Sequence, residues 1–289
     1  MSLILRNIPL SRGLALALGL LLSLVASAQR RAEGIAELLG WQPGDTAVCV
    51  PAHARQLPAY ALASIPGLRS VTFAPGSQCR IIAAYAFAGC DSLREVRFPS
   101  SVVSIGEGAF RECVSLRRVN IPEAVRVIPK ECFLRCESLD SILLSPRLVE
   151  IKGFAFAQCA SLSEIKIPES VVEIATNAFA LCKSLTEVRL PKGLEILESY
   201  VFTGCEQLRS VTMPGQPHDI GELIFEDCPS LSEIIEPAMS APPIECASWL
   251  ASPEDTAFYK RVTLRVPRAA IDRYRSARAW CLFKNIKPL

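Results

Sequence analysis

Histidine, on which many catalytic and metal sites depend, is nearly absent from this sequence. Only His53 and His218 occur among its 289 residues, and both fall at variable positions that we expect on the surface. There is no Gly-rich phosphate loop, no H-E-x-x-H motif and no G-x-S-x-G motif. A carboxylate pair such as Glu195 and Glu198 stands alone, whereas a glycosidase needs two carboxylates across a deep cleft. We therefore expect no enzymatic activity, no metal site and no cofactor.

Long apolar runs are also missing, except near the amino end. There, residues 14–25 form an apolar run of 12 residues, Arg6 and Arg12 are the charges before it, and small residues at 26–28 precede Gln29. This order is typical of a secretory signal peptide. The run is shorter than the roughly 20 residues that a membrane-spanning helix needs. We predict a signal peptide at residues 1–28 and no transmembrane segment in the mature chain.

An excess of positive charge is absent as well. The sequence has 31 Lys and Arg against 29 Asp and Glu, and removal of residues 1–28 leaves 29 of each. Nucleic acids and anionic membranes attract proteins with a basic excess. We therefore expect neither nucleic acid nor an anionic membrane to be the main partner.

The sequence does contain an internal repeat of 23 residues. Phenylalanine recurs in register at Phe87, Phe110, Phe133, Phe156, Phe179, Phe202 and Phe225. Cysteine follows three residues after each, at Cys90, Cys113, Cys136, Cys159, Cys182, Cys205 and Cys228. Leucine follows three residues later again, at Leu93, Leu116, Leu139, Leu162, Leu185, Leu208 and Leu231. Seven copies in one register indicate a chain of equivalent structural units.

One copy, residues 86–108, shows how a unit folds. Leu93, Val96 and Phe98 have the spacing of a short strand with one buried face, because the last two alternate with polar residues. Pro99 has no N–H for a strand ladder and ends the strand. The part that carries Ala, Phe and Cys is typical of a turn of helix that packs inward.

A single unit cannot bury its apolar side, whereas stacked units can, because each rung covers the face of the last. We therefore predict an α/β-type repeat solenoid, a right-handed leucine-rich-repeat superhelix with short parallel strands and about ten rungs in a single elongated domain. The expected parts are an N-terminal cap at 29–47, the repeat array at 48–237, and an interrupted last rung with a C-terminal cap at 238–289. An amphipathic helix at 269–280 should cover the last rung.

The twelve cysteines divide into two groups. Seven repeat at one slot of each unit, where their side chains point in parallel and do not face each other as a disulfide requires, so we predict buried free thiols. Cys132 stands four residues before Cys136, but too few further ligands exist for a metal site, and we expect a tolerated small residue. The other cysteines give two candidate disulfides, Cys246 with Cys281 in the C-terminal cap and Cys49 with Cys79 near the second rung.

The repeat units and the closing segment resemble a known family. The array contains units such as AFAGCDSLREVRFPSSVVSIGEG, and the chain closes with VTLRVPRAAIDRYRSARAWCLFKNIKPL. Over residues 48–289 these resemble the repeats and the C-terminal capping unit of the BspA-type bacterial leucine-rich repeat family. The resemblance implies an exported protein, extracellular or at the cell surface, that binds extracellular matrix, host or neighbouring-cell proteins.

Solenoids bind partners through the outward side chains of their strands, because stacking presents these side chains together. The repeat predicts two outward columns, whose surface we call the strand face. The first column is Glu95, Arg118, Ser141, Glu164, Glu187, Ser210 and Glu233. The second column is Arg97, Asn120, Leu143, Lys166, Arg189, Thr212 and Ile235.

Two interpretations of the strand face remain open at this point. Pairs such as Glu164 with Lys166 fit a solvated face whose ion pairs contribute little. The apolar Leu143 and Ile235, together with the cations, fit a site for a partner with acidic groups. The columns contain no aromatic residue for sugar stacking, which favours a polypeptide partner over a glycan. The predicted binding residues are Glu95, Arg97, Arg118, Asn120, Leu143, Glu164, Lys166, Glu187, Arg189 and Ile235.

Together these features predict an exported, monomeric protein of the binding or adhesion type, which recognises a macromolecular partner through its strand face. The alternative is a periplasmic scaffold or docking protein without an adhesion role, since the sequence shows no obvious surface anchor.

Overall fold

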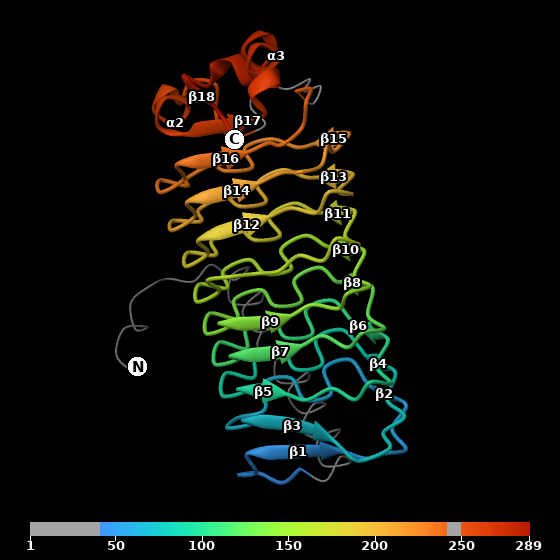
Figure 1. Cartoon of the computed structure of the whole chain (residues 1–289). Helices are drawn as coiled ribbons and strands as arrows, with labels where there is room; N and C mark the ends of the chain where they lie inside the picture. Colours follow the sequence, from blue (N-terminus) through green and yellow to red (C-terminus); the bar gives the residue numbers. More distant parts are fainter. Residues whose placement is uncertain (1–40, 242–249) are drawn as a thin grey trace, which may run out of the picture.

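The computed structural model describes residues 41–241 and 250–289, so the predicted signal peptide and most of the predicted N-terminal cap lie outside the described residues. The described chain is an elongated stack of rungs that follows the sequence from β1 to β18 (Figure 1). All its strand pairs are parallel, and partners in the regular part are one repeat apart, as Val119 and Ile142 are. The predicted repeat solenoid of about ten rungs is confirmed.

The strands form two rows along the stack (Figure 1). The first row consists of β1 (Ala47–Val50), β3 (Ser70–Phe73), β5 (Glu95–Val96), β7 (Arg118–Asn120), β9 (Ser141–Leu143), β12 (Glu187–Arg189), β14 (Ser210–Thr212), β16 (Glu233–Ile235), β17 (Thr263–Val266) and β18 (Asn285–Pro288). The second row consists of β2 (Gln56–Leu57), β4 (Ile81–Ile82), β6 (Ser104–Ile105), β8 (Val127–Ile128), β10 (Glu150–Ile151), β11 (Glu173–Ile174), β13 (Ile196–Leu197) and β15 (Asp219–Ile220).

The first-row strands are short and have one buried face, as the alternating sequence predicts. In β7, Val119 is buried while Arg118 and Asn120 are exposed, and β12 shows the same alternation. A proline such as Pro122 or Pro191 follows shortly after the strand, where its missing N–H prevents further pairing. The outer surface of the first row is therefore the strand face.

The segments that carry the Phe and Cys of each repeat form turns, and the predicted turn of helix is wrong. Two residues of each such turn have a left-handed backbone, for example Glu131 (φ 57°) and Arg135 (φ 61°). Between them, Phe133 N donates to Ala155 O of the next rung at 2.8 Å. An α-helix would direct that N–H to its own preceding turn. The described α-helices lie instead in the C-terminal cap.

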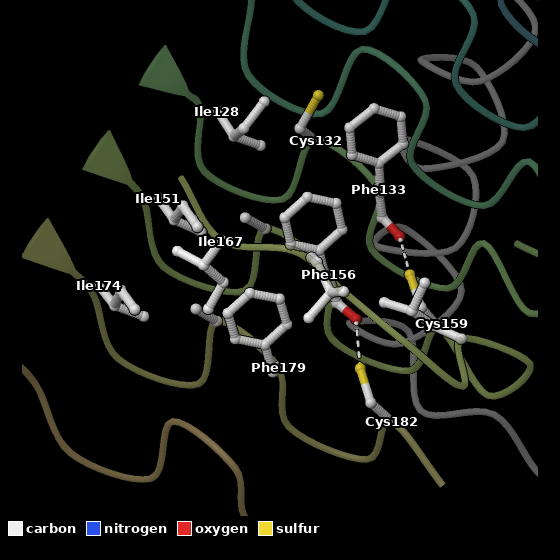
Figure 2. Packing of buried hydrophobic residues seen from close by; sticks show 14 of the residues in the cluster. Ile128, Cys132, Phe133, Ile151, Phe156, Cys159, Ile167, Ile174, Phe179 and Cys182 are labelled. Atoms are coloured by element: carbon white, nitrogen blue, oxygen red, sulfur yellow. Dashed lines mark hydrogen bonds between the residues drawn. The ribbon is translucent and has the colours of Figure 1, made fainter. Parts of the chain in front are cut away.

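The phenylalanine column stacks face to face through the interior (Figure 2). The ring centroids of Phe133 and Phe156 are 5.4 Å apart and those of Phe156 and Phe179 are 5.2 Å apart, with planes within 6° of parallel. Ile128 and Ile151 of the second row are fully buried in the same interior. The recurring apolar residues thus form one continuous core.

The cysteine column bonds to the backbone of the rung before it. Cys159 Sγ donates to Phe133 O at 3.2 Å, and Cys182 Sγ donates to Phe156 O at 3.2 Å (Figure 2). The seven repeated cysteines are buried and free, which confirms the prediction of free thiols. Burial raises the pKa of Cys182 to about 12, so this thiol stays protonated at neutral pH and is a poor nucleophile.

Short elements close the array at its C-terminal end (Figure 1). They are α2 (Thr256–Arg261), α3 (Ile271–Ser276) and two 3-10 helices, η1 (Arg268–Ala270) and η2 (Trp280–Leu282). The helix predicted at 269–280 is wrong in extent, because α3 ends where Ala277 becomes extended and Ala279 is left-handed (φ 66°). Tyr274 and Trp280 are fully buried and meet edge to face with centroids 5.1 Å apart.

Two elements of this cap, α2 and β18, were not predicted. The Asp255 carboxylate caps α2 by accepting a hydrogen bond from Phe258 N at 2.9 Å. β18 pairs in parallel with β17, with Ile286 beside Leu264, and adds a strand beyond the predicted last rung. At the opposite end of the stack, Trp41 is buried against the core. In the described part of the chain, none of the helices has the length and apolarity to span a membrane.

Candidate docking surface on the strand face

The two predicted outward columns lie side by side on the first row. Glu95, Arg118 and Ser141 are register partners on β5, β7 and β9. Asn120 is likewise the register partner of Leu143 in the second column. The predicted binding residues are all exposed or half-buried. The structure therefore brings them together on one surface, as the repeat predicts.

The first row is interrupted in its middle. One sheet ends at β9 and another begins at β12, and between them Glu164 forms an isolated bridge to Glu187. The repeat pattern changes at the same place, since proline shifts by one residue to Pro146 and Ser145 takes its usual position. Ser145 is buried, and its hydroxyl donates to Glu123 O at 2.7 Å. This rung therefore differs from its neighbours and does not pair with the following rung along the first row.

A hollow lined in part by aliphatic side chains, which we call the apolar hollow, lies between β9 and the following rung. It has a volume of about 520 Å³. Its aliphatic lining comes from Ile142, Leu143, Leu144 and Ile167, and its charged lining comes from Asp140, Glu164 and Lys166. Ile142 occupies an inward slot, yet it is only half-buried because β9 has no paired strand on this side. The hollow was not predicted, and the proline shift was the sequence signal that could have indicated it.

A second, more polar hollow lies on the other side of the same rung. It has a volume of about 650 Å³, and its lining includes Glu164, Lys166, Glu187 and Arg189. Lys166 pairs with Glu164 at 3.7 Å, and Arg189 pairs with Glu169 at 3.8 Å. Exposed ion pairs of this kind contribute about 0–1 kcal/mol each to stability. The fold does not depend on these charges, which leaves them available to a partner.

The repeat pattern matches a known sequence profile. The profile of the BspA type leucine rich repeat region matches residues 55–186 and 149–241, in 6 copies. The chain belongs to the BspA-type leucine-rich repeat family. A leucine-rich repeat protein from T. pallidum is similar to this BspA-type chain at 31% identity, with a TM-score of 0.53, over 66% of this chain and 86% of that one.

Two further solved structures share the solenoid fold of the BspA-type chain. A leucine rich cell surface protein from Faecalibacterium prausnitzii is 22% identical, with a TM-score of 0.51, over 87% of this chain and 81% of that one. A leucine-rich repeat protein from Bacteroides ovatus is 20% identical, with a TM-score of 0.56, over 84% of this chain and 73% of that one. No protein of curated function matches the chain.

The titratable groups of the BspA-type chain are dispersed. His53, just after β1, and His218, just before β15, are exposed and stand in widely separated rungs. Within residues 41–241 and 250–289, no three side chains of His, Cys, Asp or Glu come together as a set of metal ligands. Cys132 is fully buried in a column where Ala109 and Ala155 are the neighbouring members.

The two candidate disulfides have different outcomes. Cys49 is exposed on the outer side of β1, whereas Cys79 is buried, and both are free thiols. The Cys49–Cys79 pairing is therefore wrong, because the two side chains lie on opposite sides of the rung wall. Cys281 is exposed, and Cys246 lies outside the described residues, so the Cys246–Cys281 disulfide stays a prediction.

A buried carboxyl, Glu236, lies at the junction between the array and the C-terminal cap. Its Oε1 accepts a hydrogen bond from Ala238 N at 3.0 Å, and its Oε2 has no hydrogen-bond partner in the described structure. The side chain borders a small apolar cavity lined in part by Leu197 and Met213. Burial raises the pKa of Glu236 to about 8. At neutral pH this carboxyl is therefore protonated, and it faces inward from the strand face.

Proposed function

We propose that this chain is an exported protein-binding module of the adhesion type, which docks a polypeptide partner on its strand face. The observation that carries the proposal is the cluster of aliphatic side chains in the hollow at β9, within a surface that is mostly polar. Leu143 is 63% exposed at its edge, and Ile142 is incompletely covered. An apolar centre surrounded by charged side chains is the usual plan of a protein–protein interface.

The chemistry of the strand face favours a polypeptide over a carbohydrate. The two outward columns contain no aromatic side chain on which a sugar ring would stack. A polypeptide offers both an aliphatic side chain for the hollow and charged groups for residues such as Lys166 and Arg189. Rigid stacking of the rungs holds these features in place before binding, which lowers the entropic cost of association.

The amino-terminal sequence supports export. Residues 1–28 have the charged start, apolar run and small residues of a signal peptide. The Faecalibacterium prausnitzii relative is described as a cell surface protein. The proposal extends that location to this chain.

Charge reversal on the strand face tests the proposed function. We expect the triple variant Arg97→Glu, Lys166→Glu, Arg189→Glu to lose the protein that the wild-type chain retains from an extracellular extract. The reason is that the three changes reverse the charge at positions along the strand face, where complementarity selects the partner. The retained protein is identified by mass spectrometry, and its affinity for each variant is then measured by calorimetric titration.

The matched control is the triple variant Arg55→Glu, Arg80→Glu, Arg126→Glu. It makes the same charge change at exposed arginines that directly precede second-row strands. Circular dichroism checks that both variants stay folded. Unchanged affinity in the strand-face variant, or an equal loss in the second-row control, would contradict the proposal.

A further inference from the structure

A group of arginines lies beside the apolar hollow. Arg69, Arg94 and Arg117 directly precede β3, β5 and β7, and their backbones bond in register. Arg94 N donates to Arg69 O at 2.8 Å, and Arg117 N donates to Arg94 O at 3.1 Å. Parallel strands lie about 4.8 Å apart, so three guanidinium groups arise from adjacent rungs. Arg97 and Arg118 of the strand face stand on the same rungs, and we call these five residues the arginine group.

Most of the arginine group has no ion-pair partner among the described residues. In the part of the chain that the structure describes, Arg69, Arg94, Arg117 and Arg118 are exposed and form no ion pair. Arg97 forms an ion pair at 3.0 Å with Glu95 of its own rung. Like charges in register on neighbouring strands repel each other, which lowers stability. An anionic ligand would remove that repulsion.

The arginine group and the apolar hollow are neighbours in one sheet. β7 pairs with β9, and Asn120 of β7 is the register partner of Leu143 at the edge of the hollow. Asp140 follows Arg117 in register, with Asp140 N donating to Arg117 O at 3.1 Å, and ends the basic column. A ligand that lies along the stack therefore meets positive charge over β3 to β7 and aliphatic carbon at β9.

We propose that the partner docks through a segment in which a run of Asp or Glu lies next to a large aliphatic residue. The carboxylates lie on the arginine group, and the aliphatic side chain enters the hollow at β9. This inference rests on the proposed function, because it names the chemistry of the segment that the strand face receives. A sulfated polysaccharide or a nucleic acid would satisfy the arginines but has no aliphatic group for the hollow.

The spacing of the arginine group fits a helical segment that lies along the stack. Carboxylates one helical turn apart are separated by about 5.4 Å, close to the rung spacing of about 4.8 Å. Long arginine side chains absorb the difference. The distance from β3 to β9 is three rung spacings, or about 14 Å, which about ten helical residues span.

Fluorescence anisotropy with a synthetic peptide tests this inference on the full chain. The labelled probe has about 14 residues, with Glu at successive helical turns and a Leu pair at one end. Matched peptides replace the Glu residues with Gln, or the Leu pair with Ser. We expect the Glu–Leu peptide to bind at least about tenfold more tightly than either matched peptide. Added salt should reduce the affinity that the Glu residues contribute and should leave the contribution of the Leu pair unchanged.

Variants then assign each half of the peptide to its place on the strand face. The double variant Arg94→Glu, Arg117→Glu should no longer distinguish Glu–Leu from Gln–Leu peptides. Leu143→Ser should no longer distinguish Glu–Leu from Glu–Ser peptides. The control Arg80→Glu, Arg126→Glu, beside the second row, should distinguish all three peptides as the wild type does. Each variant and peptide pair forms a double-mutant cycle, which isolates the contact.

Stability gives a readout that separates lost binding from lost folding. Arg94→Glu places a carboxylate between Arg69 and Arg117, so we expect its urea midpoint to rise while its affinity for the Glu–Leu peptide falls. A variant that lost binding through misfolding would have a lower midpoint.

Three outcomes would overturn the inference. The first is equal binding of Glu–Leu and Gln–Leu peptides by the wild type, and the second is lost discrimination in the second-row control. The third is heparin binding that is tighter than peptide binding and unaffected by Leu143→Ser, which would assign the arginine group to a polysaccharide. These outcomes leave the proposed function standing, because that proposal fails on the partner-retention experiment with the strand-face triple variant.

Discussion

Glu236 places a carboxyl in a column that is apolar in other rungs. The equivalent positions hold Phe98, Ile121, Leu144, Ile167, Leu190 and Met213. Burial holds the pKa of Glu236 at about 8, against an ordinary value of 4.5. The native state therefore keeps a proton that the unfolded chain releases between these two values. Because of this group, the free energy of unfolding falls as pH rises from about 4.5 to about 8. Above about pH 8 the group causes no further change in that free energy.

We predict that Glu236→Gln removes this pH dependence. The Gln carbonyl retains the hydrogen bond from Ala238 N, but the side chain has no charge to bury. Relative to wild type, the variant should gain about 4 kcal/mol between pH 5 and pH 8.5. Urea unfolding of both proteins at several pH values measures the gain. Tyr274 in α3 is the neighbouring titratable group. Burial raises the pKa of Tyr274, and the nearby Glu236 raises it further. Tyr274 therefore stays neutral in this pH range. A difference that is constant with pH would show that Glu236 is not buried as described.

At the residue scale, the period of the repeat was enough to separate inward from outward side chains. Arg118 and Asn120 lie outward and Val119 inward, as alternation requires. The half-buried state of Ile142 was not predictable in this way, because it depends on whether the next rung pairs with β9. The arginine group was also only partly predicted, since Arg94 and its equivalents stand just before the strands, outside the alternating pattern.

At the scale of the element, each rung depends on side chains that stack on the rungs before and after it. Phe156 lies between Phe133 and Phe179, and Leu162 is fully buried in its own column. We predict that Phe156→Ala or Leu162→Ala lowers the free energy of unfolding by about 2–5 kcal/mol, because each leaves a cavity between packed rungs. Urea unfolding at equilibrium measures the loss.

Leu143→Ala is the matched control for this prediction. It also truncates an aliphatic residue of a first-row rung, but Leu143 is 63% exposed. Its effect on stability should stay within about 0.5 kcal/mol. Similar losses in the three variants would contradict the assignment of the Phe and Leu columns to the core.

Strands were predictable as elements, whereas the conformation of the turns and the detail of the cap were not. Alternation followed by proline marks the first-row strands at positions such as Val96–Pro99. The turns escape prediction because non-glycine residues such as Glu131 and Arg135 take left-handed conformations there. Their N–H groups are satisfied by the neighbouring rung, which is a contact between repeats that no single repeat encodes. In the cap, α2 has only six residues, too few for a periodic signal, and α3 covers only part of the helix predicted at 269–280.

At the scale of the whole molecule, stacking converts a repeated sequence into a long surface with one local irregularity. The rungs hold the outward columns in register from β1 to β9 and from β12 to β18. Between these sheets the first row opens, and the apolar hollow and the arginine group lie next to each other on the surface. The fold was predictable from the repeat, while the proposed place of contact depends on the point where the repeat departs from its own pattern.

Site-directed photo-cross-linking tests the central claim, that the strand face receives the partner. Benzoylphenylalanine is placed singly at Asn120 or Thr212 on the strand face, and at Arg126 or Glu195 beside the second row, all at exposed or half-buried positions. The account predicts an adduct with one and the same protein from both strand-face positions and none from the second-row positions. Adducts from the second row, or equal yields from both rows, would contradict it.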